Sequence, residues 1–292
     1  MMLEKIKYII VSMRPNHWVK NLFVFAGLIF SRNLFETSSL LKVSLGFVLF
    51  SLTSSSVYLF NDIRDISYDR NHPQKSKRPI ASGKLGTSEA CTASVSLALV
   101  SLGGSFIMDR LFSLILLTYI CVNVAYSIKL KQVVIIDVMV IALGFVLRVL
   151  GGTVLVGVSP SDWLIICTMA ISLFLGFSKR RQELVLAEAN STKQRQVLQQ
   201  YSLPFLDQMI AVVTGCTVIS YALYTVSPET VTRFGTRDLV LSLPFVLYGI
   251  FRYLYLVYLR PSGENPTEVI LKDVPFLANL GLWFVVVLIV VY

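Results

Sequence analysis

The chain has 292 residues, of which 55% are hydrophobic and 15% are charged, and its formal net charge is +9. The mean hydropathy of +0.70 is too high for a soluble domain, and apolar runs recur from end to end. Residues 1–292 are therefore expected to form a single polytopic membrane domain. The basic residues lie in separated short loops without an RNA- or DNA-binding motif, which argues against a nucleic-acid partner.

Nine apolar segments are each about 20 residues long, the length of a helix that crosses about 30 Å of hydrocarbon. They lie near residues 17–35, 40–60, 88–107, 111–128, 134–156, 162–178, 205–226, 239–258 and 273–291. We expect an all-α bundle of nine transmembrane helices. The side that holds the N-terminus would carry 19 Lys and Arg, against five on the other side. By the positive-inside rule the N-terminus and the basic loops face the cytoplasm, and an odd helix count places the C-terminus outside.

The polar loop after the second segment reads NDIRDISYDRNHPQKSKRPIASGK, residues 61–84. If residues 57–70 continue as a helix, about one quarter of its surface carries four oxygen-bearing side chains, Asn61, Asp62, Asp65 and Asp69. Clustered carboxylates repel one another unless a cation joins them, and hard oxygen ligands suit Mg²⁺, which often shares substrate phosphates. The pattern predicts a Mg²⁺-diphosphate site. The alternative is a solvated loop in which the carboxylates pair with Arg64, Arg70 and neighbouring lysines.

The second half of this loop is basic and bounded by prolines. Pro73 and Pro79 restrict the backbone, so Lys75 and Arg78 would be held on a constrained loop. Ammonium and guanidinium groups in such a position can bind phosphate oxygens. The alternative is a charge cluster that only sets membrane topology.

Ionisable residues also occur at the end of the fourth apolar segment and inside the fifth. Tyr126 and Lys131 lie at a predicted helix end, whereas Asp137 and Arg148 lie within the fifth segment. Intramembrane ionisable groups are costly and usually face the bundle interior, so both are candidates for a site. The alternative is that each pairs with another helix for structural reasons. By i,i+3 and i,i+4 spacing, Tyr126 also belongs with Asn123 and Ser127 to a polar stripe on one side of the fourth predicted helix.

The loop after the sixth segment begins with SKRRQEL. Its three adjacent cations, Lys179, Arg180 and Arg181, favour an anion. The alternative is a topogenic cluster with a Lys179 to Glu183 pair at i,i+4, worth about 0.3 kcal/mol.

The stretch NDIRDISYDRNHPQKSKRPIASG resembles the first aspartate-rich motif of the UbiA superfamily of intramembrane prenyltransferases. Nine helices with cytoplasmic loops after the second and sixth match that fold. Typical members carry a second aspartate-rich motif after the sixth helix, where SKRRQEL stands here. Together with YSIKLK, RVLGG, RYLYLVY and NPTEVILKD, this departure resembles one branch, the decaprenyl-phosphate phosphoribosyltransferases. In that branch the donor is phosphoribosyl pyrophosphate and the acceptor is a polyprenyl monophosphate, and a cationic loop suits the phosphate monoester.

The resemblance implies a multi-pass enzyme of the cytoplasmic membrane whose active site faces the cytoplasm and serves synthesis of a cell-envelope glycan precursor. It implies Mg²⁺ ligation by Asn61, Asp65 and Asp69, with Asp62 nearby, and it extends the catalytic set to Asp62, Asp65, Asp69 and Asp137. It implies substrate binding by Lys75, Arg78, Tyr126, Lys131, Arg148, Lys179, Arg180, Arg181 and Glu183. A homo-oligomeric assembly stays open. The competing functions are a prenyltransferase acting on an aromatic or lipid acceptor and, in another class, an anion transporter.

Overall fold

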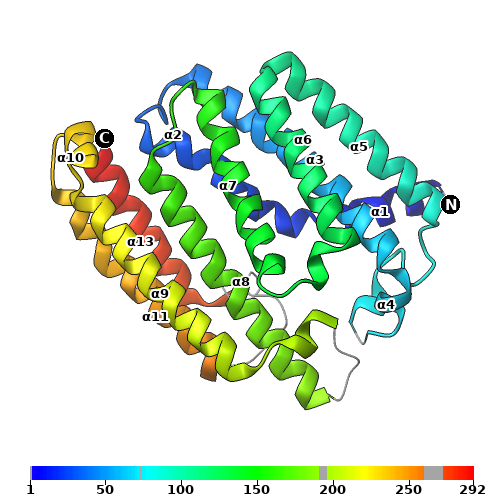
Figure 1. The fold of residues 1–292 in the computed structure, drawn as a ribbon. Coiled ribbons are helices and arrows are strands. Elements are labelled where there is room, and N and C mark those ends of the chain that lie inside the picture. Colours follow the sequence, from blue (N-terminus) through cyan, green and yellow to red (C-terminus); the bar gives the residue numbers. More distant parts are fainter. Residues whose placement is uncertain (1, 73, 191–195, 260–271) are drawn as a thin grey trace. The chain divides into compact units, whose positions relative to one another are not determined.

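The computed structural model describes residues 2–72, 74–190, 196–259 and 272–292, and every regular element among them is a helix (Figure 1). The chain forms two compact units, an N-terminal unit, Met1–Pro160, and a C-terminal unit, Ser161–Tyr292. The all-α class is confirmed for the described residues. The organisation of the chain as one domain stays a prediction.

The N-terminal unit contains α1 (Met2–Met13), η1 (Pro15–Phe25), α2 (Ala26–Phe30), α3 (Thr37–Arg64), α4 (Ile66–Arg70), η2 (Lys75–Lys77), α5 (Thr87–Met108), α6 (Arg110–Ile128), η3 (Leu130–Gln132) and α7 (Ile136–Val156). The C-terminal unit contains α8 (Asp162–Asn190), η4 (Gln196–Gln200), α9 (Leu203–Val226), α10 (Pro228–Phe234), η5 (Asp238–Ser242), α11 (Leu243–Leu259) and α13 (Val274–Val291). The elements labelled η are 3₁₀ helices.

Local sequence signals set several helix ends. The Asp109 carboxylate accepts a hydrogen bond from the Phe112 N–H at 2.8 Å and caps α6. Asp273 caps α13 in the same way, through the Phe276 N–H at 2.9 Å. Both contacts satisfy backbone donors that the first helical turn leaves without a partner. At the C-terminal end of α7, Gly157 adopts a left-handed conformation with φ of 78°, which glycine takes without a steric penalty.

Eight described helices are long and apolar enough to cross a membrane. They correspond to the second to ninth predicted segments. The first predicted segment, residues 17–35, differs because about half of it belongs to the 3₁₀ helix η1, which passes into the short helix α2 and then into a turn before α3. Apolar composition predicted this segment, but composition does not distinguish 3₁₀ from α geometry.

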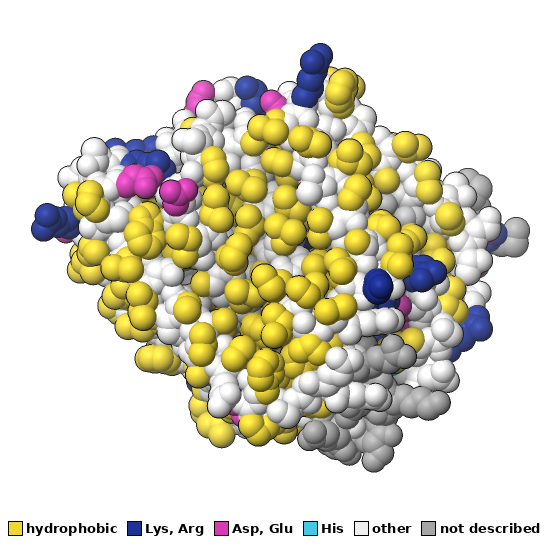
Figure 2. Space-filling model, viewed as in Figure 1, with side chains coloured by type: hydrophobic (Ala, Val, Ile, Leu, Met, Phe, Trp, Pro, Cys, Tyr) yellow, Lys and Arg dark blue, Asp and Glu magenta, His cyan; other side chains and the backbone are white. Residues whose placement is uncertain are grey.

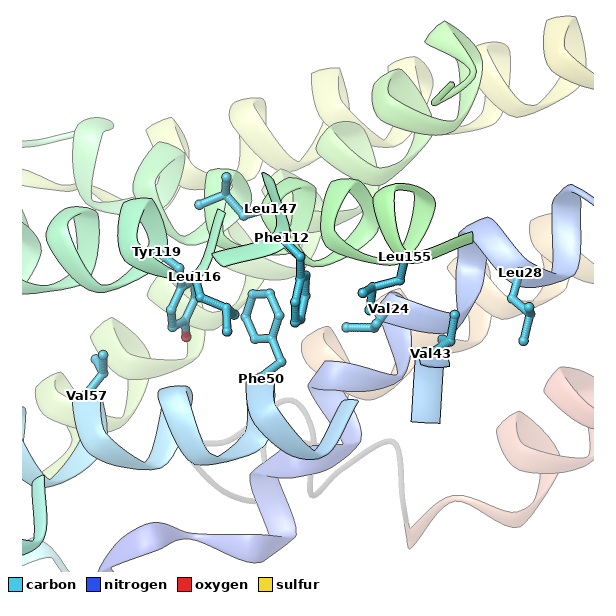
Figure 3. Close-up of a cluster of buried hydrophobic side chains, with 10 residues drawn as sticks. All are labelled: Val24, Leu28, Val43, Phe50, Val57, Phe112, Leu116, Tyr119, Leu147 and Leu155. Carbon is cyan, nitrogen blue, oxygen red and sulfur yellow. The ribbon is translucent and has the colours of Figure 1, made fainter. Parts of the chain in front are cut away.

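Contacts along η1 and α2 show that this segment runs antiparallel to α3. Near its start, the Trp18 indole N–H donates to Ser55 Oγ at 3.1 Å. Further on, Asn21 Nδ2 donates to Ser51 Oγ at 2.9 Å. Val24 and Leu28 then join a buried cluster with side chains of α3, α6 and α7, including Val43 and Phe50 (Figure 3).

Glycine allows α7 to approach η1 closely. A Cβ atom placed on Gly152 would lie 1.8 Å from the Val24 carbonyl oxygen. That separation is far inside van der Waals contact with main chain, which cannot swing aside as a side chain can. Gly152 therefore lets the 3₁₀ segment pack directly on α7.

The surface of both units is largely apolar. Figure 2 shows hydrophobic side chains spread over the visible face, with few charged side chains among them. Ile107 at the end of α5 is 87% exposed and Ile289 in α13 is 75% exposed. Such side chains suit contact with lipid, because hydrocarbon imposes no penalty on exposed apolar surface.

Candidate active site

The carboxylate cluster lies where α3 passes into α4. The predicted continuous helix over residues 57–70 is interrupted at Asp65, whose φ and ψ are −97° and 10°. Hydrogen bonds still connect the two helices, because the Asp65 N–H donates to Asn61 O at 3.0 Å and the Asp69 N–H donates to Asp65 O at 2.8 Å. Across this junction, Asp62 and Asp69 lie close enough for one side chain to contact both.

One guanidinium joins the two most buried carboxylates of the cluster. Asp62 and Asp69 are each only 2% exposed. Arg78 Nη1 lies 3.1 Å from Asp62 Oδ1 and 2.6 Å from Asp69 Oδ2. Arg78 follows η2 and adopts an extended conformation, so the proline-bounded loop predicted from the sequence brings this side chain to the carboxylates.

Two further cations come from distant parts of the N-terminal unit. Arg14, at the junction of α1 and η1, donates to Asp62. Lys131, in η3 after α6, donates to Asp65. The carboxylates thus pair with basic residues, as the alternative interpretation of this loop expected, but with other partners.

The basic neighbours named in that alternative lie elsewhere. Arg64 is exposed. Arg70 Nε donates to the Ala81 carbonyl oxygen at 3.2 Å, which ties α4 to the end of the following loop. Lys75 lies over the Tyr68 ring, with its Nζ 5.6 Å from the centroid. These contacts stabilise the loop around the cluster. The carboxylates of the cluster pair instead with Arg14, Arg78 and Lys131.

The chemistry of the cluster suits both a divalent cation and a phosphate. Three carboxylates offer hard oxygen ligands, and three cations offer charge-assisted donors. The formal charges of the two sets cancel. As the side chains stand, no group of three or more His, Cys, Asp or Glu among the described residues is arranged to hold a metal ion. A metal would therefore have to take oxygen atoms that now accept from basic side chains.

Asn61 and the end of α6 meet at the edge of the cluster. Ser127 Oγ donates to Asn61 Oδ1 at 3.1 Å. Of the predicted polar stripe on this helix, Asn123 instead donates to the Tyr119 carbonyl oxygen of its own helix. Tyr126 is partly exposed on the same turn as Ser127. Asp137, in the first turn of α7, is fully buried.

Arg148 occupies the interior of the N-terminal unit. Its three guanidinium nitrogens donate to Asn21 Oδ1 at 2.7 Å, to the Gly144 carbonyl oxygen at 2.7 Å and to Tyr119 Oη at 3.0 Å. The guanidinium also lies over three aromatic rings, with that of Phe50 5.1 Å away. No described carboxylate is within ion-pair distance of it. Arg148 thus joins α7 to η1 and α6.

The basic loop of the C-terminal unit is a continuation of α8. Arg180 is fully buried and lies 2.5 Å from Glu183 Oε2. Lys179 lies 3.6 Å from Glu183 Oε1, which is the pair that the alternative interpretation expected. Residues 179–190 are thus helical, and residues 191–195 lie outside the described part of the chain.

Arg181 is held by two other helices of the same unit. Its Nε lies 2.6 Å from Asp207 Oδ1 of α9. Its guanidinium stacks on the Tyr258 ring at 3.9 Å, and the Tyr258 hydroxyl donates to the same Asp207 oxygen at 2.8 Å. This network ties the end of the basic run to α9 and α11.

Sequence analysis did not single out Arg14 and Asp207. Arg14 precedes Pro15 at the start of the first apolar segment, and that position at a membrane boundary was the available signal. The RYLYLVY motif, residues 252–258, contributes Tyr258, whereas most of NPTEVILKD, residues 265–273, lies outside the described residues.

Comparison with known proteins gives a family and a fold. The model of the UbiA prenyltransferase family matches residues 21–268. The chain is 33% identical to the decaprenyl-phosphate phosphoribosyltransferase of Mycolicibacterium smegmatis, over 94% of this chain and 90% of that relative. It is 31% identical to the protein of the same name from Mycobacterium tuberculosis, over 91% of this chain and 88% of the relative. The fold is similar to that of a UbiA homolog from Archaeoglobus fulgidus bound to GPP and Mg²⁺, with a TM-score of 0.74, 18% identity, and 97% and 99% of the two chains covered.

Proposed function

This chain belongs to the UbiA prenyltransferase family, and from that membership we propose that it is a polyprenyl-phosphate phosphoribosyltransferase. It transfers the 5-phosphoribosyl group of phosphoribosyl pyrophosphate to a decaprenyl-like monophosphate and releases pyrophosphate, in a Mg²⁺-dependent step toward a cell-envelope glycan precursor. The observation that carries this proposal is similarity along almost the whole chain to two decaprenyl-phosphate phosphoribosyltransferases. The paired acidic and basic cluster of the N-terminal unit supports it.

Asn61, Asp65 and Asp69 would hold Mg²⁺, with Asp62 beside them. Bound Mg²⁺ supplies positive charge that stabilises the pyrophosphate as a leaving group. The chain's own basic residues complete this environment. Arg14, Arg78 and Lys131 now satisfy the carboxylates, and they would pass to phosphate oxygens when a metal takes the carboxylates.

Bond formation at ribose C1 requires little from a general base. The bond from C1 to the pyrophosphate oxygen breaks, and an oxygen of the polyprenyl phosphate forms the new bond to C1. A phosphate dianion is already nucleophilic, so the protein need only bind and orient it. Lys179, Arg180 and Arg181 are assigned to a phosphate monoester, with Glu183 positioning Arg180. Tyr126 and Lys75 are assigned to the donor, and Asp137 and Arg148 to positioning within the N-terminal unit.

The segment formed by η1 and α2 is assigned as a membrane crossing, which comes before the other eight in the chain and brings the total to nine. Eleven residues of η1 at about 2.0 Å each and five of α2 at about 1.5 Å span about 30 Å, the thickness of the hydrocarbon core. Its antiparallel path along α3 supports the assignment. Nine crossings put the N-terminus and the carboxylate cluster at the cytoplasmic side of the inner membrane and the C-terminus outside. Cysteines placed at Lys5 and Tyr292 of a cysteine-free variant test this, since only the second should react with an impermeant reagent in intact cells.

The function is tested by a two-donor assay on the purified protein. Labelled phosphoribosyl pyrophosphate with polyprenyl phosphate is compared with geranylgeranyl diphosphate plus an aromatic acceptor, and the lipid product is analysed by mass. We expect pyrophosphate release and a phosphoribosyl lipid from the first pair only, and loss of both in Asp69→Asn. Asp162→Asn, at the exposed start of α8, is the control. Release from the prenyl donor alone would assign a prenyltransferase instead.

A further inference from the structure

One lysine of the N-terminal unit lies within the segment assigned as the first membrane crossing and has no counter-ion. Lys20 is the sixth residue of η1, so it lies about 12 Å along a segment of about 30 Å. Among the residues that the structure describes, it has no hydrogen bond or ion pair. Ionisable side chains inside a membrane are costly and usually pair with an opposite charge. A cation left in this state indicates an anionic ligand.

The three faces of η1 have different surroundings. A 3₁₀ helix has three residues per turn, so side chains three positions apart share a face. On one face, Asn21 is fully buried and donates to a serine of α3. On the second face, Leu22 is 52% exposed. The third face carries His17, Lys20 and Phe23, and each of these side chains is only partly exposed. Lys20 therefore belongs neither to the buried face nor to the exposed one.

Aromatic contacts place the face of Lys20 against α3 and α7. The His17 ring packs edge-on against the Tyr58 ring of α3, with centroids 5.6 Å apart. One turn after Lys20, the Phe23 ring packs in the same way against the Phe145 ring of α7, with centroids 5.0 Å apart. Both partner rings are themselves only partly exposed. Lys20 thus lies between two aromatic contacts to neighbouring helices, on a face that keeps surface accessible to a ligand.

The charged groups that act on Lys20 are positive. They are the guanidinium groups of Arg148 and Arg14. Arg14 pairs with Asp62, whereas Arg148 has no carboxylate within ion-pair distance in the described part of the chain. Like charges in a partly buried site repel one another. Lys20 and Arg148 therefore give this region two positive charges that have no acidic partner among the described residues.

This unbalanced charge selects the class of ligand. A metal ion would add to the positive charge, and a carboxylate would balance only one of the two cations. A phosphate monoester carries nearly two negative charges at neutral pH, and its oxygens accept from the three donors of an ammonium group. The three guanidinium nitrogens of Arg148 already donate to protein acceptors. Arg148 would thus contribute its charge, and Lys20 would make the direct contact.

We propose that Lys20 binds a phosphate monoester within the N-terminal unit, deeper in the membrane than the carboxylate cluster. The inference rests on the proposed function, whose reaction contains two such groups. One is the 5-phosphate of phosphoribosyl pyrophosphate, and the other is the phosphate of the acceptor lipid. Both offer the same chemistry to an ammonium group, and the substrate that depends on Lys20 identifies the source.

The kinetic test compares Lys20→Met with wild type in the full-length enzyme, with KM measured separately for phosphoribosyl pyrophosphate and for polyprenyl phosphate. Loss of a charge-assisted contact should raise the KM of at least one substrate by about tenfold or more. Lys20→Arg keeps the charge and should retain most of the wild-type affinity. Lys42→Met, at an exposed lysine of α3, is the matched control and should leave both KM values unchanged. Unchanged KM values for both substrates in Lys20→Met would overturn the proposal.

A structural role of Lys20 is tested by the thermal midpoint without substrate. Lys20→Met should leave the midpoint unchanged or raise it, because the variant removes a charge that other cations repel. A clear decrease would show that the ammonium group stabilises the protein itself, and it would overturn the proposal.

A binding measurement separates this proposal from the proposed function, because it requires no transfer reaction. Ribose 5-phosphate and farnesyl phosphate are added separately, and at least one should raise the midpoint of wild type more than that of Lys20→Met. Pyrophosphate with Mg²⁺ should shift both proteins equally, since it belongs to the carboxylate cluster. Equal shifts of the two proteins with both monoesters, or a smaller pyrophosphate shift in the variant, would overturn the site even if transfer is observed. A difference confined to the monoesters would support the site even if transfer is not.

Discussion

Arg78→Ala tests whether one guanidinium holds the two buried carboxylates together. Removing it leaves Asp62 with Arg14 but takes from Asp69 its ion-pair partner. Breaking a buried ion pair costs about 3–5 kcal/mol. The Arg78 side chain is 27% exposed and that of Asp69 is 3% exposed, so partial screening reduces the expected loss to about 2–3 kcal/mol. For a unit of this size that lowers the thermal midpoint by about 4–12 °C.

A double-mutant cycle with Asp69→Asn isolates the pair. Arg78→Ala leaves the Asp69 carboxylate buried without its partner, and Asp69→Asn removes that charge. The double variant should therefore lose less free energy of unfolding than the two single variants together, by at least about 1 kcal/mol. The midpoints are measured in one detergent without Mg²⁺ or substrate, because both ligands would shift the stability of the folded state. Arg64→Ala, at an exposed position at the end of α3, should stay within about 0.5 kcal/mol of wild type.

Mg²⁺ provides a second readout of the same contact. If the metal competes with Arg78 for Asp69, Mg²⁺ alone should raise the midpoint of Arg78→Ala more than that of wild type. Additive single effects in the cycle, together with equal Mg²⁺ shifts in the two proteins, would refute the reasoning. An additive cycle with unequal Mg²⁺ shifts would assign the pair to metal binding alone. A non-additive cycle with equal Mg²⁺ shifts would assign it to stability alone.

Four further changes test the N-terminal unit. Arg148→Lys should lower the free energy of unfolding by about 2 kcal/mol, because one ammonium group cannot replace three hydrogen bonds from a planar fork; thermal unfolding measures it. Gly152→Ala should prevent normal packing of η1 and greatly reduce the yield of folded protein, whereas Gly103→Ala, where an added Cβ meets nothing within 4 Å, should not. Lys131→Ala should raise the KM for phosphoribosyl pyrophosphate by about tenfold through loss of a charge-assisted phosphate contact, measured by pyrophosphate release, and Asp65→Asn should abolish Mg²⁺-dependent release.

Periodic and local features were predictable from the sequence. Eight of the nine apolar segments form long helices, because twenty apolar residues in a row leave the backbone few other ways to satisfy its hydrogen bonds in lipid. The loop that carries Arg78 was also predictable, because its prolines restrict the backbone and the loop follows the carboxylates directly in sequence. In both cases the deciding interactions are local.

Partners from distant segments could not be predicted in this way. Arg14 reaches Asp62 across 48 residues, and Arg148 reaches Asn21 across 127. Both contacts depend on the antiparallel path of η1, which in turn depends on glycine at position 152. The sequence indicated that Arg148 faces the bundle interior, but not that neutral acceptors and aromatic rings stabilise it, because sequence spacing does not reveal such partners.

The balance of charge in the carboxylate cluster predicts how its ligands bind. Arg14, Arg78 and Lys131 cancel the formal charge of Asp62, Asp65 and Asp69, so the ligand-free cluster is neutral. Mg²⁺ alone would displace cations that have no new partner, and pyrophosphate alone would draw cations away from buried carboxylates. When both bind, the carboxylates contact Mg²⁺ and the cations contact pyrophosphate, so every charged side chain keeps a partner of opposite sign. This arrangement has the lower free energy in a partly buried site. Mg²⁺ and pyrophosphate should therefore raise the thermal midpoint jointly by more than the sum of their separate shifts, and a strictly additive result would contradict the exchange.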